Sequence, residues 1–122
     1  MARVLICDDA AFMRMTIREA LERGGHEVVA EATDAQEAIE IYDKLKPDLV
    51  TMDLLMKTSG QKGIRGILEK DPKAKIIIIS VLDDQEGEVV EGVRMGALGI
   101  VTKPIKREVM LGEVERVLAI QL

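Results

Sequence analysis

The stretch Val4-Leu5-Ile6-Cys7-Asp8-Asp9 is a short apolar run that stops at two carboxylates. An uninterrupted apolar run of this length, bounded by polar residues, is typical of a strand that is buried on both faces. Three later runs also end at polar residues: 49–52 at Asp53, 75–79 at Ser80, and 98–102 at Lys103. Strands buried on both faces belong to parallel sheets, so these four polar ends are expected to share one edge.

Helical patterns separate the apolar runs. Residues 11–23, 34–45, 88–95 and 106–120 carry apolar residues at helical spacing, and residues 27–32 supply a further strand. Residues 57–66 contain three glycines, which predicts a weak and short third helix. Strands that alternate with helices form a parallel sheet covered on both faces. We therefore predict an α/β fold: a doubly wound (βα)5 sandwich with five parallel strands, in a single domain spanning residues 1–122.

The same patterns assign several side chains to the core or to the surface. Phe12, Met15 and Ile17 are expected on the apolar face of the first helix, and Val109 with Met110 on that of the last. Met13, Met15, Met52 and Met56 are interpreted as core filler, and Cys7 as a small buried hydrophobe. His26 is expected in a surface turn, and the acidic residues 83–86 in a solvated loop.

Composition excludes several classes of protein. The 17 basic and 22 acidic residues give a net charge of −5, which does not favour binding to nucleic acid or to an anionic membrane. No apolar run approaches the roughly 20 residues that span a bilayer. The start of the chain enters a strand pattern at once, without a signal peptide, and a single cysteine suits a reducing compartment. We expect a cytoplasmic protein.

The polar strand ends predict a metal site. Ligands of open parallel sheets bind in the crevice outside the carboxyl ends of the strands, where Asp8, Asp9, Asp53 and Lys103 are expected to meet. Carboxylates 4 Å apart repel by about 4 kcal/mol per pair at an effective dielectric constant of about 20, so the cluster needs a cation. A hard divalent ion, which prefers oxygen ligands, is the cation best suited to this cluster.

Taken together, these segments resemble the response-regulator receiver family. The resemblance rests on residues 3–14, on residues 47–56, on Ser80, and on Lys103 with Pro104, and it spans the whole chain. Within the family the chain is similar to the stand-alone, CheY-like chemotaxis regulators. The resemblance implies a flavodoxin-like strand order of 2-1-3-4-5.

The resemblance also implies a role for each site residue. Asp53 would be the phosphoacceptor, Ser80 the hydroxyl that hydrogen-bonds the phosphoryl group, and Lys103 its charge partner, with Pro104 in a cis bond. Mg²⁺ would be ligated directly by Asp9 and Asp53, through water by Asp8, and by the backbone carbonyl of Leu55. A histidine kinase would donate the phosphoryl group. An output protein would bind the fourth helix, the fifth strand and the last helix.

Two alternatives remain at this point. Lys57, Val81 and Ile100 depart from the family's usual residues, which would suit a pseudo-receiver that acts as an adaptor without phosphorylation. A phosphate-ester hydrolase with an aspartyl-phosphate intermediate would use similar groups, but its Asp-x-Asp motif is absent after the first strand. Under the leading hypothesis the protein is not an enzyme beyond its own phosphorylation and dephosphorylation.

Overall fold

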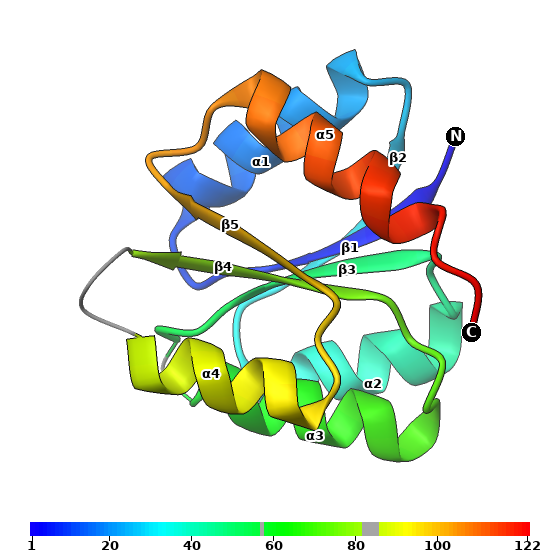
Figure 1. The fold of residues 1–122 in the computed structure, drawn as a ribbon, viewed down its shortest axis with the longest axis vertical. Coiled ribbons are helices and arrows are strands. Elements are labelled where there is room, and N and C mark those ends of the chain that lie inside the picture. Colours follow the sequence, from blue (N-terminus) through cyan, green and yellow to red (C-terminus); the bar gives the residue numbers. More distant parts are fainter. Residues whose placement is uncertain (57, 82–85) are drawn as a thin grey trace.

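The computed structural model describes residues 1–56, 58–81 and 86–122 of the chain (Figure 1). One sheet contains five strands, all parallel, in the order β2-β1-β3-β4-β5. This arrangement confirms the predicted doubly wound fold. The strands and helices are, in chain order, β1 (Arg3–Cys7), α1 (Ala11–Arg23), β2 (Glu27–Ala32), α2 (Ala35–Leu45), β3 (Leu49–Asp53), α3 (Gly60–Lys70), β4 (Ile76–Val81), α4 (Glu86–Met95), β5 (Gly99–Lys103) and α5 (Arg107–Leu118).

Helices cover both faces of the sheet. In Figure 1, α1 and α5 lie above the strands, and α2, α3 and α4 lie below them. Each face has its own core, because alternate residues of a strand point to opposite sides. Leu5, Val50 and Ile78 belong to one core, whereas Val4, Ile6 and Ile77 belong to the other. The near-continuous apolar runs in the sequence reflect this burial on both faces.

Because all five strands run in the same direction, their carboxyl ends lie at one edge of the sheet, at the left of Figure 1, where each strand leads into the next helix. The start of α2 shows how the sequence sets such a connection. The Asp34 side chain accepts a hydrogen bond of 2.8 Å from the Glu37 N–H, and Glu37 accepts one of 2.7 Å from the Thr33 N–H. The two acids lie three residues apart, which is the spacing of a capping box, and their side chains satisfy two backbone N–H groups at the start of the helix.

The third helix corrects the prediction of a short element. Helix α3 has 11 residues, begins after the N-cap Ser59, and includes all three glycines of the 57–66 segment. A Cβ on Gly63 would lie 2.7 Å from Met52 Cε, and one on Gly66 would collide with Ile39. The glycines therefore recur at every third position because the helix packs closely against β3 and α2. Tertiary packing outweighs the low helix propensity of glycine here.

The inward faces of α1 and α5 differ from the prediction at three residues. Phe12 and Met15 are 74% and 60% exposed, and Val109 is 57% exposed. Ile17 is fully buried as predicted, and the buried stripe of α1 is completed by Met13, Ala20 and Leu21, which pack in the core shared with α5. This stripe follows the helical period more closely than the predicted one. Met52 is fully buried, and Met13 and Met56 are packed against the cores, as expected.

The connection between β4 and α4 is shorter than predicted. Strand β4 extends to Val81, and α4 begins at Glu86, so residues 86–88 are helical although the sequence suggested a loop to residue 88. Residues 82–85, and with them most of the expected solvated acidic loop, lie outside the described residues, as does Lys57.

Candidate functional site

The predicted acidic residues converge at the carboxyl edge of the sheet. Asp8 directly follows β1, Asp53 is the last residue of β3, and Lys103 is the last residue of β5. One carboxylate oxygen from each of Asp8, Asp9 and Asp53 lies within 4.8 Å of the others. Asp8 and Asp53 are buried, whereas Asp9 is exposed. The topology brings these groups together because strands β1 and β3 are neighbours and both run toward this edge.

The two carboxylate oxygens of Asp8 have different surroundings. Oδ1 accepts a hydrogen bond of 2.9 Å from the Ala10 N–H. Oδ2 is buried without a hydrogen-bond partner among the described residues, and the Lys103 ammonium lies 3.8 Å from it. Burial raises the pKa of Asp8 to about 6, and the nearby Asp53 raises it further. The hydrogen bond from Ala10 and the charge of Lys103 lower this pKa, but they do not cancel the increase. An orphaned buried oxygen of this kind needs a cation or a proton.

Lys103 joins the two buried carboxylates. Its Nζ lies 3.5 Å from Asp53 Oδ2, in addition to its contact with Asp8. Asp53 Oδ1 accepts a hydrogen bond of 3.2 Å from the Leu55 N–H. The Lys103–Pro104 peptide bond is cis, as the resemblance implied. A single ammonium does not balance three carboxylates, so the site keeps an excess of negative charge.

The donor set fits Mg²⁺. Three carboxylates within 4.8 Å of one another, one of them with a buried oxygen that has no partner in the described chain, offer the hard oxygen ligands that this ion prefers. The side chain of Leu55 is exposed beside the cluster. The ligand role of its carbonyl remains a prediction.

Ser80 and Ile100 lie on the two strands beyond β3. Ser80 is buried in β4, one residue past the register partner of Asp53. Ile100 lies on β5 and is 37% exposed, and its N–H donates a hydrogen bond of 2.9 Å to Glu113 Oε2 in α5. The predicted switch hydroxyl thus lies on the strand next to the acceptor strand, while its role in switching is still a prediction.

Arg14 is a site residue that sequence reasoning missed. Its side chain reaches from α1 to the Asp8 carbonyl, to which Nη1 donates a hydrogen bond of 2.8 Å. Its Nε also donates to Glu31 on β2 at 2.7 Å. Helical spacing alone does not identify Arg14 as a site residue, because its partners come from the loop after β1 and from β2, which only the fold brings together. Cys7 behaves as expected: it is buried, and burial raises the pKa of its thiol.

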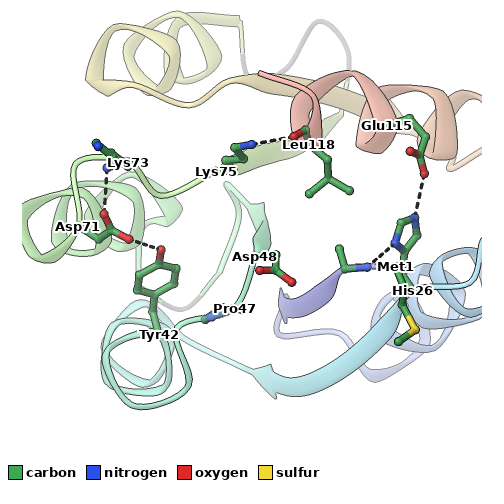
Figure 2. A pocket seen from close by; sticks show the side chains of 11 residues that line it. Met1, His26, Tyr42, Pro47, Asp48, Asp71, Lys73, Lys75, Glu115 and Leu118 are labelled. Carbon is green, nitrogen blue, oxygen red and sulfur yellow. Dashed lines mark hydrogen bonds and ion pairs between the residues drawn. The ribbon is translucent and has the colours of Figure 1, made fainter. Parts of the chain in front are cut away.

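A cavity of about 600 Å³ lies at the opposite edge of the sheet, and its lining includes His26, Tyr42, Asp48 and Lys75 (Figure 2). Its polar groups bond within the chain. Tyr42 donates a hydrogen bond of 2.7 Å to Asp71, and Lys75 donates one of 2.8 Å to the Leu118 carbonyl. This cavity lacks the convergent charge of the acidic cluster.

His26 corrects the prediction of a surface turn residue. It is 6% exposed, and its Nδ1 accepts a hydrogen bond of 3.1 Å from the Ala2 N–H. Its Nε2 lies 3.2 Å from Glu115 Oε1 in α5 (Figure 2). The flanking glycine did suggest a turn, but α5 folds back over it, and this long-range packing is not visible in local sequence.

Comparison with known proteins identifies the family. The family model for the response regulator receiver domain matches residues 4–115. The chain is 46% identical over 105 residues to the chemotaxis protein CheY of Thermotoga maritima, with 85% of this chain and 87% of that protein covered. It is 44% identical over 119 residues to the protein CcdB of Bacillus subtilis, with 97% and 98% covered.

Solved structures agree with this result. The CheX–CheY complex with BeF3 and Mg²⁺ from Borrelia burgdorferi superposes with a TM-score of 0.90 at 30% identity, covering 97% of this chain and 90% of that one. The response regulator domain of Thermotoga maritima CheB superposes with a TM-score of 0.88 at 31% identity, covering 98% of both chains. This chain therefore belongs to the response regulator receiver domain family, the phosphoryl-accepting modules of two-component signalling. Across the described residues, no helix is both long and apolar enough to cross a membrane.

Proposed function

We propose that the chain is a chemotaxis-like response regulator that accepts a phosphoryl group on Asp53 from a histidine kinase and changes its partner binding as a result. One observation carries this proposal: the Asp53 carboxylate lies 3.5 Å from the Lys103 ammonium, inside a cluster of three carboxylates. The complete set of charged groups also makes the adaptor hypothesis less favourable. The relatives named as chemotaxis proteins support the choice of pathway.

The chemistry follows from the charges in the site. An ionised carboxylate is already the attacking form, so Asp53 needs no separate base. The incoming phosphoryl group is negative, and Lys103 offsets the repulsion between it and the carboxylates. Asp9 and Asp53 would hold Mg²⁺ directly, Asp8 through water, and the Leu55 carbonyl as a further ligand. When bound, the ion supplies positive charge to the phosphoryl oxygens.

The surface beside the site supports an output role. Four of the exposed apolar side chains come from consecutive elements: Val90 and Val93 from α4, Ile100 from β5, and Val109 from α5. Each is between 37% and 57% exposed. We infer that an output protein binds these elements. Ser80 and Lys103 lie at the ends of the adjoining strands, so a change at Asp53 has a short path to this surface. With a kinase as donor, we place the protein in the cytoplasm.

The experiment is phosphorylation by a small phosphodonor, with and without Mg²⁺, followed by intact-protein mass spectrometry. Wild type should gain one acid-labile phosphoryl group only when Mg²⁺ is present, and Asp53→Ala should gain none. Asp43→Asn is the matched control, because the ion pairs of Asp43 with described residues are to the surface lysines Lys46 and Lys70. If Asp53→Ala still gains a phosphoryl group, the acceptor is a different residue. If wild type gains none, the adaptor hypothesis is favoured instead.

A further inference from the structure

The loop between β1 and α1 carries both Asp8 and Asp9, and its conformation decides where their carboxylates lie. The N-cap residue of α1 is Ala10, whose side chain makes no capping hydrogen bond, and the first turn of the helix has no acidic residue. The Asp9 side chain is exposed and makes no hydrogen bond within the described part of the chain. The position of Asp9 therefore depends on the backbone of this loop.

Arg14 holds that backbone. Its Nη1 donates a hydrogen bond of 2.8 Å to the Asp8 carbonyl, and this oxygen belongs to the peptide plane that joins Asp8 to Asp9. A peptide unit is planar, so a contact that fixes the carbonyl also fixes the direction in which the chain enters Asp9. The Asp8 N–H is bound at 3.0 Å by the Ala32 carbonyl of β2. The N–H and the carbonyl of Asp8 are thus both hydrogen-bonded to residues outside the loop.

Glu31 in turn holds Arg14. Glu31 Oε1 accepts from Arg14 Nε at 2.7 Å, while Oε2 accepts from Arg18 Nε at 2.9 Å and Nη2 at 2.6 Å. These hydrogen bonds, first that from Arg18, lower the pKa of Glu31 against the opposing effect of burial. The Arg14 side chain is only 17% exposed, so the guanidinium lies in a shielded and directed position. Charge-assisted contacts of this kind are stronger than neutral ones.

We propose that Arg14, anchored by Glu31, is a positioning residue that shapes the β1–α1 loop for Mg²⁺ binding by Asp8 and Asp9. The inference rests on the metal site of the proposed function. It is distinct from a charge effect, because a nearby cation repels Mg²⁺. Removing Arg14 would tighten Mg²⁺ binding if charge alone mattered, whereas loss of positioning weakens it. The two explanations therefore predict changes of opposite sign.

Arg18 supplies a matched control. It lies one turn further along α1 and contacts the same Glu31, but none of its hydrogen bonds reaches Asp8. Arg14→Met and Arg18→Met remove the same charge and one partner of the same carboxylate. Similar losses of metal-free stability in urea are expected for both. Only Arg14→Met removes the contact to the loop.

The test is the Mg²⁺ dissociation constant from amide shifts at fixed ionic strength, with urea unfolding in a chelator alongside. Arg14→Met should weaken binding on the order of tenfold, as loss of a group that orients metal ligands typically does. Arg18→Met should stay within about twofold of wild type or bind slightly tighter, because its charge is screened and remote. Arg14→Lys should also weaken binding, since one ammonium does not reproduce the planar fork that contacts Glu31 and Asp8 together.

Glu31→Ala tests the anchor and serves if Arg14→Met fails to fold. It should weaken Mg²⁺ binding in the same direction, and the double variant should lose less than the sum of the two single losses. Mg²⁺ binding that is unchanged or tighter in Arg14→Met, or unchanged in Arg14→Lys and Glu31→Ala, would overturn the inference. A wild type that binds no Mg²⁺ would overturn the proposed metal site itself, and this inference with it.

Discussion

At the scale of single residues, Asp8 combines a structural and a chemical role. Oδ1 accepts a hydrogen bond of 2.9 Å from the Ala10 N–H, while Oδ2 lies 3.8 Å from the Lys103 ammonium. Holding a buried carboxylate ionised next to others is costly unless a cation compensates. The high pKa of Asp8, about 6, expresses this cost. The metal-free fold is therefore under electrostatic strain at neutral pH.

This strain predicts a pH dependence of stability. Unfolded Asp8 ionises near the ordinary value of 3.8, whereas folded Asp8 ionises near 6. The folded state thus binds more protons between these values, and its stability falls as the pH rises from about 4 to above 6. Urea unfolding in a chelator should show a lower free energy of unfolding at pH 7.5 than at pH 5. Mg²⁺ at pH 7.5 should restore the loss, because it binds only the folded site.

Asp8→Asn checks the assignment of this pH dependence. Asparagine keeps an oxygen to cap Ala10 but carries no charge, so the metal-free variant should be more stable than wild type at pH 7.5. Its stability should change less between pH 5 and pH 7.5, and Mg²⁺ should stabilise it less. An identical pH profile in wild type and variant would assign the titration to another group.

At the scale of elements, α3 shows how three glycines build a packed helix. Gly60 is the most constrained of them, because a Cβ there would lie 2.7 Å from Leu54 Cα and collide with the Asp53 carbonyl. The start of α3 therefore rests directly on the strand end that carries the proposed acceptor. A side chain at Gly60 has to move backbone, whereas one at Gly63 meets the flexible end of Met52.

Gly60→Ala should lower the free energy of unfolding by about 1–3 kcal/mol, because the added methyl overpacks the contact with β3. Gly112 in α5 is the control, since a Cβ built there has no described neighbour within 4 Å apart from its adjacent residues and the backbone of its own helix. Gly112→Ala should instead raise stability by about 0.5–1 kcal/mol through helix propensity alone. Urea unfolding measures both. A neutral or stabilising Gly60→Ala would show that α3 shifts away from β3 at little cost.

His26 links three elements, since it lies before β2, accepts from the backbone that leads into β1, and faces α5. Because Nδ1 accepts the Ala2 N–H, the neutral ring carries its proton on Nε2, next to Glu115. His26→Ala should cost about 1–3 kcal/mol, as it leaves a buried N–H without its acceptor. Glu115→Gln should change stability by less than about 0.5 kcal/mol, because that carboxylate is 67% exposed. Equal losses of stability for His26→Ala and Glu115→Gln, measured by thermal or urea unfolding, would contradict the prediction that the Ala2 hydrogen bond matters more than the Glu115 contact.

At the scale of the whole molecule, the acidic site and the exposed apolar surface lie on adjoining parts of the fold. The site occupies the carboxyl edge of the sheet, and the apolar residues of α4, β5 and α5 occupy its β5 side. Ile100 has a β-branched side chain that is stiff at χ1, and its N–H is bound to Glu113. A large side-chain swing at this position is therefore not available as a signal.

Activation should instead move the end of β4 and helix α4, while residues 82–85 between them lie outside the described residues. Addition of beryllofluoride with Mg²⁺, which mimics the phosphoryl group on aspartate, should shift the amide resonances of residues 81–95 more than those of α2. Ile100→Ala should weaken activation only mildly. Amide shifts confined to the surroundings of Asp8, Asp9 and Asp53 would show that this surface does not switch.

The sequence by itself determined the order of strands and helices, the burial of the sheet on both faces, and the four charged residues of the site. Apolar runs that stop at Asp8, Asp53 and Lys103 carry this information locally, because strand period and strand end are properties of adjacent residues. The family resemblance added the strand order and the cis bond at Pro104, and the fold contains both.

Tertiary structure decided the features that depend on distant partners. Arg14 is anchored by Glu31 because β1 and β2 pair, His26 is buried with α5 packed beside it, and α3 keeps its glycines because β3 and α2 approach closely. Phe12 and Val109 are exposed for the same reason: the side of each helix that packs against the sheet is set by the tertiary fold. Local periodicity states which residues share a face, but only packing between elements states which face is buried.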